Sequence, residues 1–115
     1  MNAAMFYKSF SRLPIQARLG NLAVTINRLA DSLEQHQNQE GTKGFAREAM
    51  WFIEWTALEV NLEIQTELIE MQRQLAQWNR HWNDTWNTLE KSNKMKIETR
   101  VMSNKLLEWA GLNQI

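Results

Sequence analysis

The sequence predicts an all-α protein, and three observations support this fold class. Apolar residues recur at helical spacing through most of the chain. Residues 45–110 contain neither glycine nor proline, the residue types that most often interrupt a helix. No segment alternates apolar and polar residues over a useful length, so no β-strand is predicted. The expected architecture is an antiparallel helical bundle, built as a dimer around one long central helix.

The first helix is predicted at about residues 13–37. Pro14 suits its first turn, because the φ angle is already fixed and an N–H there would lack a partner. Apolar residues follow at alternating spacings of four and three, the a/d pattern of a coiled coil: Ile15, Leu19, Leu22, Ile26, Leu29 and Leu33. Residues 1–12 are expected to be flexible or loosely packed, and Gly41 and Gly44 indicate a loop after the helix.

A single continuous helix is predicted at about residues 44–91, with a length of roughly 70 Å. When consecutive residues are placed ~100° apart around the helix axis, the apolar residues all fall within an arc of about 80°: Ala46, Met50, Ile53, Ala57, Val60, Ile64, Leu68, Met71, Leu75, Trp78, Trp82, Trp86 and Leu89. The phase changes after Leu89. We therefore expect a break near residues 90–93 and a third helix at about 93–110, with Ser92 or Asn93 as its N-cap.

The middle of this central helix carries a second apolar stripe on its opposite side: Trp51, Trp55, Leu58, Leu62 and Ile69. A helix that is apolar on two opposite faces must be buried on both. A rod of ~70 Å also exceeds a compact monomer of this length, whose radius of gyration should be near 13 Å. These five residues are therefore predicted to form a homodimer interface. The alternative is a helix that kinks near residues 79–84, giving a four-helix monomer.

The charges balance overall, with 13 Lys and Arg against 13 Asp and Glu, so a nucleic-acid partner is not expected. Four acids of the central helix lie on one strip: Glu59, Glu63, Glu67 and Glu70. Like charges at this spacing repel by a few tenths of a kcal/mol, so basic groups nearby would relieve them. Either the basic first helix or the second copy faces the strip, or the strip is an acidic docking surface for a basic protein partner.

The sequence shows no arrangement of residues that is typical of catalysis or metal binding. It contains no cysteine, which excludes thiol nucleophiles and cysteine-based metal sites. Its two histidines, His36 and His81, follow Leu33 and Trp78 by three residues, so the Glu-x-x-His pattern of di-iron bundles is absent. Glycine-rich phosphate-binding motifs are absent too. We expect no enzymatic activity, no cofactor and no metal.

Three tryptophans at intervals of four, Trp78, Trp82 and Trp86, stand beside Arg80 and His81. Their rings continue the buried stripe, so wide core packing is one interpretation. Aromatic rings interleaved with cations can also line a groove that binds an apolar or aromatic small molecule, or single-stranded nucleic acid. Both interpretations remain open.

No apolar run approaches the ~20 residues of a membrane span, and the N-terminus lacks the pattern of a secretory signal. We therefore expect a cytoplasmic protein without a membrane partner. Residues 18–23 (Arg-Leu-Gly-Asn-Leu-Ala) and 52–56 (Phe-Ile-Glu-Trp-Thr) resemble small uncharacterised all-helical proteins of cyanobacteria. The resemblance implies a helical fold and carries over no catalytic or binding residue.

Together these patterns predict a non-enzymatic interaction or adaptor protein that acts through its helix faces as a homodimer. The alternative is a ligand-binding helical bundle that uses the tryptophan-rich groove.

Overall fold

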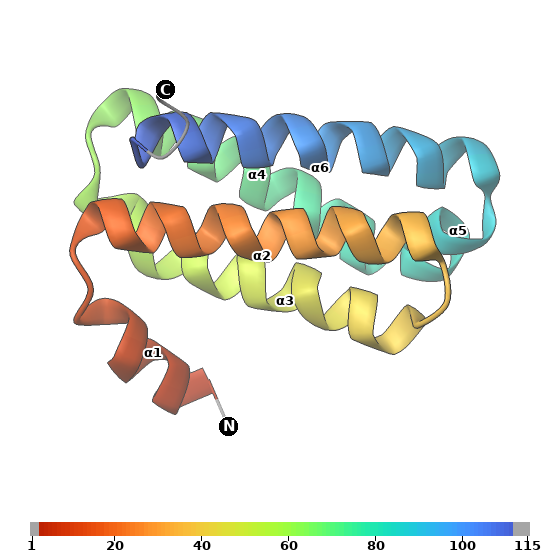
Figure 1. Ribbon diagram of the computed structural model, residues 1–115, viewed down its shortest axis with the longest axis horizontal. Coiled ribbons are helices and arrows are strands. Elements are labelled where there is room, and N and C mark those ends of the chain that lie inside the picture. Colours follow the sequence, from red (N-terminus) through yellow and green to blue (C-terminus); the bar gives the residue numbers. More distant parts are fainter. Residues whose placement is uncertain (1–2, 112–115) are drawn as a thin grey trace.

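The structure is a computed structural model that describes residues 3–111 (Figure 1). This part of the chain is helical and contains no strand, which confirms the predicted all-α class. Its elements, in chain order, are α1 (Ala3–Ser11), α2 (Ile15–Gln35), α3 (Gln39–Thr56), the 3₁₀ helix η1 (Ala57–Glu59), α4 (Leu62–Arg80), α5 (Trp82–Asn87) and α6 (Leu89–Trp109). None of these helices is long and apolar enough to cross a membrane.

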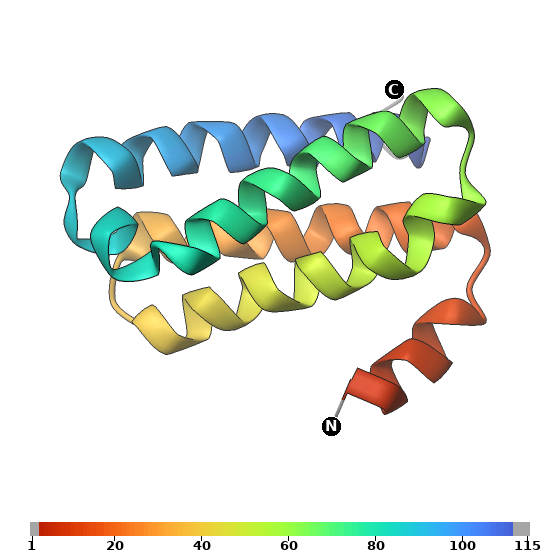
Figure 2. The same cartoon turned by 180° about the vertical axis from the view of Figure 1, so that it is seen from behind.

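Helix α2 is the centre of the packing, because its most extensive contacts are with α6 on one side and α3 on the other. Helix α4 packs on α3, and α5 packs on α6. Figure 2 shows α4 crossing the back of the bundle diagonally, while α1 projects from one end beside α3. The described residues measure 37 × 34 × 23 Å, with a radius of gyration of 13.7 Å. The longest dimension of the fold is therefore about half the length of roughly 70 Å predicted for the central helix.

The core is built from the stripes that the sequence predicted. On α2, the a/d residues from Leu19 to Leu33 are all buried, and Ile15 is half-buried. Leu22 and Ile26 have no exposed surface at all, and burying a side chain of this kind contributes about 1.5–3 kcal/mol. Of the thirteen central stripe residues, only Leu89 is exposed, at 75%. The inward face was thus identified correctly.

The predicted continuous helix at 44–91 is wrong, because the chain leaves the α-helix at residues 57–61, at His81 and at Thr88. At the first break Val60 is extended (φ −110°, ψ 168°). Asn61 then caps α4 by accepting a hydrogen bond from the N–H of Ile64 at 3.0 Å. The apolar phase survives the breaks because α3, α4 and α5 all turn their stripes towards one core.

The predicted loop at residues 41–44 is also wrong, because both glycines lie inside α3. The turn lies earlier, where His36 ends α2 in the left-handed conformation with a φ of 51°. Asn38 caps α3, and its side chain accepts a hydrogen bond from the N–H of Gly41 at 2.9 Å. Because this cap satisfies the helix N-terminus, α3 can begin ahead of both glycines.

The two flanking predictions need smaller corrections. The third helix begins at Leu89 and not near residue 93, so Ser92 lies buried within α6 and does not cap it. The N-terminal segment forms α1, whose Phe10 is 3% exposed and stacks on Phe52 with ring centres 4.2 Å apart. The described part of this segment is therefore anchored to α3 by an aromatic pair, while Met5 and Tyr7 are 54% and 51% exposed, so loose packing stays a prediction.

Arg18 holds the connection between α1 and α2 in place. Its Nε donates to the carbonyl of Leu13 at 2.9 Å, and its Nη2 donates to the carbonyl of Ser11 at 2.8 Å. Its Nη1 donates to Oε2 of Glu59 at 2.7 Å, next to the first break. Arg18 is 6% exposed, so one buried guanidinium ties the linker to the corner between α3 and α4.

Candidate functional site

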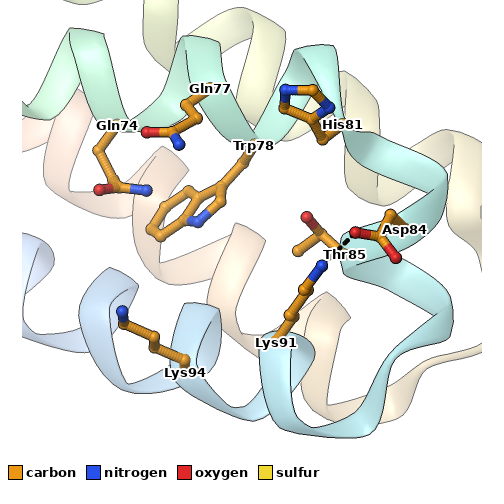
Figure 3. A pocket seen from close by; sticks show the side chains of 8 residues that line it. All are labelled: Gln74, Gln77, Trp78, His81, Asp84, Thr85, Lys91 and Lys94. Atoms are coloured by element: carbon orange, nitrogen blue, oxygen red, sulfur yellow. Dashed lines mark hydrogen bonds and ion pairs between the residues drawn. The ribbon is translucent and has the colours of Figure 1, made fainter.

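A cavity of about 500 Å³ lies where α4, α5 and α6 meet, and we call it the α4–α6 pocket. Figure 3 shows side chains from all three helices around one opening. Gln74, Gln77, Trp78 and His81 come from α4 and its C-cap, Asp84 and Thr85 from α5, and Lys91 and Lys94 from α6. Its volume falls in the range of about 300–1,000 Å³ that small-molecule sites occupy.

The pocket follows from the course of α4 across the bundle. Figure 2 shows that the C-terminal half of α4 diverges from α6, and the short α5 joins the two helices at that end. Gln74, Gln77 and His81 lie three and four residues apart, so they share one side of the helix. Trp78 continues the core stripe and is 8% exposed, so it forms a wall of the cavity.

The charged groups of the pocket leave an excess of positive charge. Asp84 forms an ion pair with Lys91, and the hydrogen bond from the Lys91 ammonium, together with its charge, lowers the pKa of the Asp84 carboxyl. Lys94 lies 4.0 Å from Glu98, and its side chain is 77% exposed. Two lysines therefore line the cavity against a single carboxylate.

The structure brings only two residues of the predicted tryptophan groove, Trp78 and His81, into this pocket. Arg80 and Trp82 line a second, smaller cavity of about 190 Å³, which His81 also borders. Trp86 stacks on Trp82, with ring centres 6.2 Å apart, and also on His36, at 4.0 Å. The three tryptophans are 8% exposed or less, which agrees with their interpretation as core residues.

The pocket residues that sequence reasoning missed come from both sides of the breaks at His81 and Thr88. Lys91 and Lys94 reach Trp78 only because the chain reverses at Thr88 and returns as α6. Under the prediction of one rod to about residue 91, Lys91 would have stood far from Trp78. Gln74 and Gln77 flank the core stripe, and their polar character beside a tryptophan was the available signal.

The predicted dimer interface divides into two parts at the first break. Trp51 and Trp55 belong to α3 and are half-buried, and Trp55 packs against Tyr7 of α1 with ring centres 5.4 Å apart. Leu58, Leu62 and Ile69 are 86%, 76% and 55% exposed. Helix α1 thus covers part of the tryptophan surface from within the same chain. The premise of one rod with two apolar faces is wrong, but three aliphatic side chains remain uncovered.

Basic residues of the same chain face most of the predicted acidic strip. Arg18 of α2 pairs with Glu59 at 2.7 Å, and Lys105 of α6 pairs with Glu67 at 2.9 Å. Glu70 pairs with Arg73, one turn further along α4. The bond from Arg18 agrees with the interpretation that the basic first helix faces the strip, whereas Lys105 comes from α6, which that interpretation did not include. Glu63 has no ion pair within residues 3–111.

Among the described residues, no group of three or more histidine, aspartate or glutamate side chains is arranged to hold a metal ion. Comparison with protein-family models gives no match for the chain. Curated proteins and solved structures give no match either. The resemblance to cyanobacterial proteins therefore stays a prediction.

Proposed function

We propose that this protein is a non-enzymatic interaction protein that acts as a homodimer through α4. The observation that carries the proposal is the exposure of Leu58, Leu62 and Ile69, at 86%, 76% and 55%. We call these three residues the aliphatic patch. Single exposed apolar residues are common on monomers, but three large ones within residues 58–69, on η1 and the first turns of α4, are typical of a contact surface.

The aliphatic character of the patch favours a second copy of the chain as the occupant, because such a surface is complementary to itself. Glu63, Glu67 and Glu70 lie in the N-terminal half of the helix, while Arg73 and Arg80 lie in its C-terminal half. Two α4 helices that cross in opposite directions about a two-fold axis at the patch would set Leu62 of each copy against Ile69 of the other, with the basic halves extending beyond the contact. Such an isologous contact uses the same patch twice, as closed dimers do.

The spacing of the patch fits this arrangement. Leu62 and Ile69 are seven residues apart and lie on the same side of α4, so they can form a short seam between two helices. Six aliphatic side chains in the dimer supply roughly 10 kcal/mol of apolar burial, against an association cost of roughly 4–15 kcal/mol. We therefore expect a reversible dimer.

The test compares two leucines of equal exposure. Leu62→Glu places a charge in the patch, and Leu89→Glu makes the same change at a leucine that is 75% exposed and lies outside it. In sedimentation equilibrium over about 1–200 μM, which covers weak to moderate association, we expect wild type and Leu89→Glu to dimerise and Leu62→Glu to remain monomeric. Far-UV circular dichroism should be unchanged for all three proteins. A monomeric wild type, or equal dimerisation of Leu62→Glu, would refute the proposal.

A further inference from the structure

The α4–α6 pocket lies on a different side of α4 from the aliphatic patch. On a helical wheel, Gln74 and Trp78 lie roughly 120° or more from Leu62 and Ile69, and Gln77, which lies roughly 60–80° from them, is about 12–22 Å further along the helix. A dimer formed through the patch would thus leave the pocket open. A function of the pocket is therefore separate from the proposed interaction, and each can fail without the other.

The charges and polar groups of the pocket define one part of a ligand. Lys91 is already paired with Asp84, but Lys94 has only Glu98 at 4.0 Å and an ammonium group close to solvent. An anionic group on a ligand can bind Lys94 without displacing a short ion pair. Such charge-assisted hydrogen bonds are stronger than neutral ones. The amides of Gln74 and Gln77 add further donors on the opposite wall.

The other part of a ligand is defined by Trp78. Its indole lies between Gln74 and Thr85 in the wall of the cavity (Figure 3). An aromatic ring packs on an indole edge-to-face or offset, and such pairs contribute about 0.5–1.5 kcal/mol beyond the burial of their surface. At about 500 Å³ the cavity has room for a fused ring system that also reaches Lys94.

We propose that the α4–α6 pocket binds a small aromatic molecule that carries a carboxylate or phosphate group. The ring packs against Trp78, the anionic group binds Lys94, and Gln74 or Gln77 donates a hydrogen bond to the ligand. Both kinds of anion share this chemistry, and the probes below distinguish them.

The experiment uses the full chain labelled with ¹⁵N and follows the indole N–H signals by NMR. Trp78→Phe identifies the signal of Trp78. The probes are naphthalene-2-carboxylate, its uncharged analogue naphthalene-2-methanol, and adenosine 5′-monophosphate. We expect saturable shifts of the Trp78 signal with at least one anionic probe, and at least about fivefold weaker binding of the uncharged analogue, because a charge-assisted bond is lost. The carboxylate and the phosphate probe separate the two sources of charge.

A matched pair of lysine variants tests the assignment of the anion site. Lys94→Gln removes the pocket lysine, while Lys96→Gln makes the same change two residues along α6, where the side chain borders a different cavity. We expect Lys94→Gln to weaken binding of the anionic probe about fivefold or more and Lys96→Gln to leave it within about twofold. Equal losses in both variants would show a general charge effect and overturn the proposal.

Two further results would overturn it. One is the absence of saturable Trp78 shifts with every probe. The other is binding of a single-stranded oligothymidylate that shifts Trp78 and is much tighter than that of the mononucleotide, because the surface would then bind a polymer and not a small ligand.

Discussion

Replacing Arg18 by methionine tests the connection that holds α1 and α2 against the corner of α3. Methionine keeps most of the apolar stem of the side chain but removes every hydrogen bond of the guanidinium. The carbonyls of Ser11, at the end of α1, and of Leu13 lose their donors. The Trp55 carbonyl loses a long contact of 3.5 Å, and Glu59 loses its ion pair. Because Arg18 is 6% exposed, water replaces these bonds poorly.

The expected loss can be estimated bond by bond. A hydrogen bond from a charged donor contributes about 1.5–3 kcal/mol when buried, and we take about 1 kcal/mol for each carbonyl because both are only partly buried. Glu59 is 56% exposed, so its ion pair adds at most about 1 kcal/mol. Arg18→Met should therefore lower the free energy of unfolding by about 3 kcal/mol, with a fall in Tm of roughly 10 °C.

Urea denaturation followed by circular dichroism measures this loss, and Arg28→Met is the matched control because Arg28 is an exposed arginine on the same helix. The control removes the attraction between Arg28 and the Glu48 carboxylate, and because Arg28 is exposed it should lower the unfolding free energy by less than about 1 kcal/mol. Arg18→Lys should recover less than half of the loss, because one ammonium cannot reach both carbonyls and Glu59 as the planar fork does. If Arg18→Met and Arg28→Met have the same free energy of unfolding, the hydrogen bonds of Arg18 do not stabilise the fold.

Two further predictions concern stability. Gly44→Ala should stabilise the protein by about 0.5–1 kcal/mol, because an added Cβ meets no atom within 4 Å and alanine favours the helix. Gly41→Ala should not, because its Cβ would lie 2.5 Å from Nδ2 of the capping Asn38; equal thermal shifts would contradict this. Burial raises the pKa of Glu48 above its usual 4.5, against an opposing attraction from Arg28. The folded state then holds this proton more tightly, so stability falls as pH rises above 4.5. Glu48→Gln should raise the urea midpoint at pH 7 but not at about pH 3.5.

The sequence was most informative about which side of each helix faces the core. On α2 the a/d spacing identified five of the buried residues, and the predicted bounds lie within two residues of both ends of the helix. Along residues 46–86 the apolar phase identified the inward side, although three helices and a 3₁₀ turn contribute to it. Hydrophobic periodicity shows which side of each helix is buried, and these helices keep a common pattern because they all pack on the same core.

The break at residues 57–61 was missed because no glycine or proline marks it, whereas the break at His81 lies within the alternative kink near 79–84 and the one at Thr88 lies close to the predicted break near 90–93. The available signals were local: Asn61 as an N-cap before Glu63 in the first turn of α4, and the β-branched Val60 before it. Once the chain turns there, Trp55 and Leu62 no longer share one rod, so the second apolar stripe ceases to be a continuous face. The periodicity could not show this difference.

The pocket could not be predicted for a related reason. Its walls combine Trp78 and Lys94, which approach each other only because α5 and the turn at Thr88 return the chain along the bundle. A tryptophan on the core stripe gives no sign that a lysine from a later helix will stand opposite. Tertiary placement, and not local spacing, creates this site.

The pairing of α2 with α6 has a consequence for biosynthesis. It joins residues 15–35 to residues 89–109, and the hydroxyl of Ser103 donates to the carbonyl of Ala23 across a separation of 80 residues. The ribosome synthesises α2 long before α6, so the apolar side of α2, which includes Leu22 and Ile26, is at first without the helix that it packs against. α2 and α6 can pack together only after residue 109 has been translated. Until then the apolar face of α2 is incompletely buried in the nascent chain, and a chaperone can bind it.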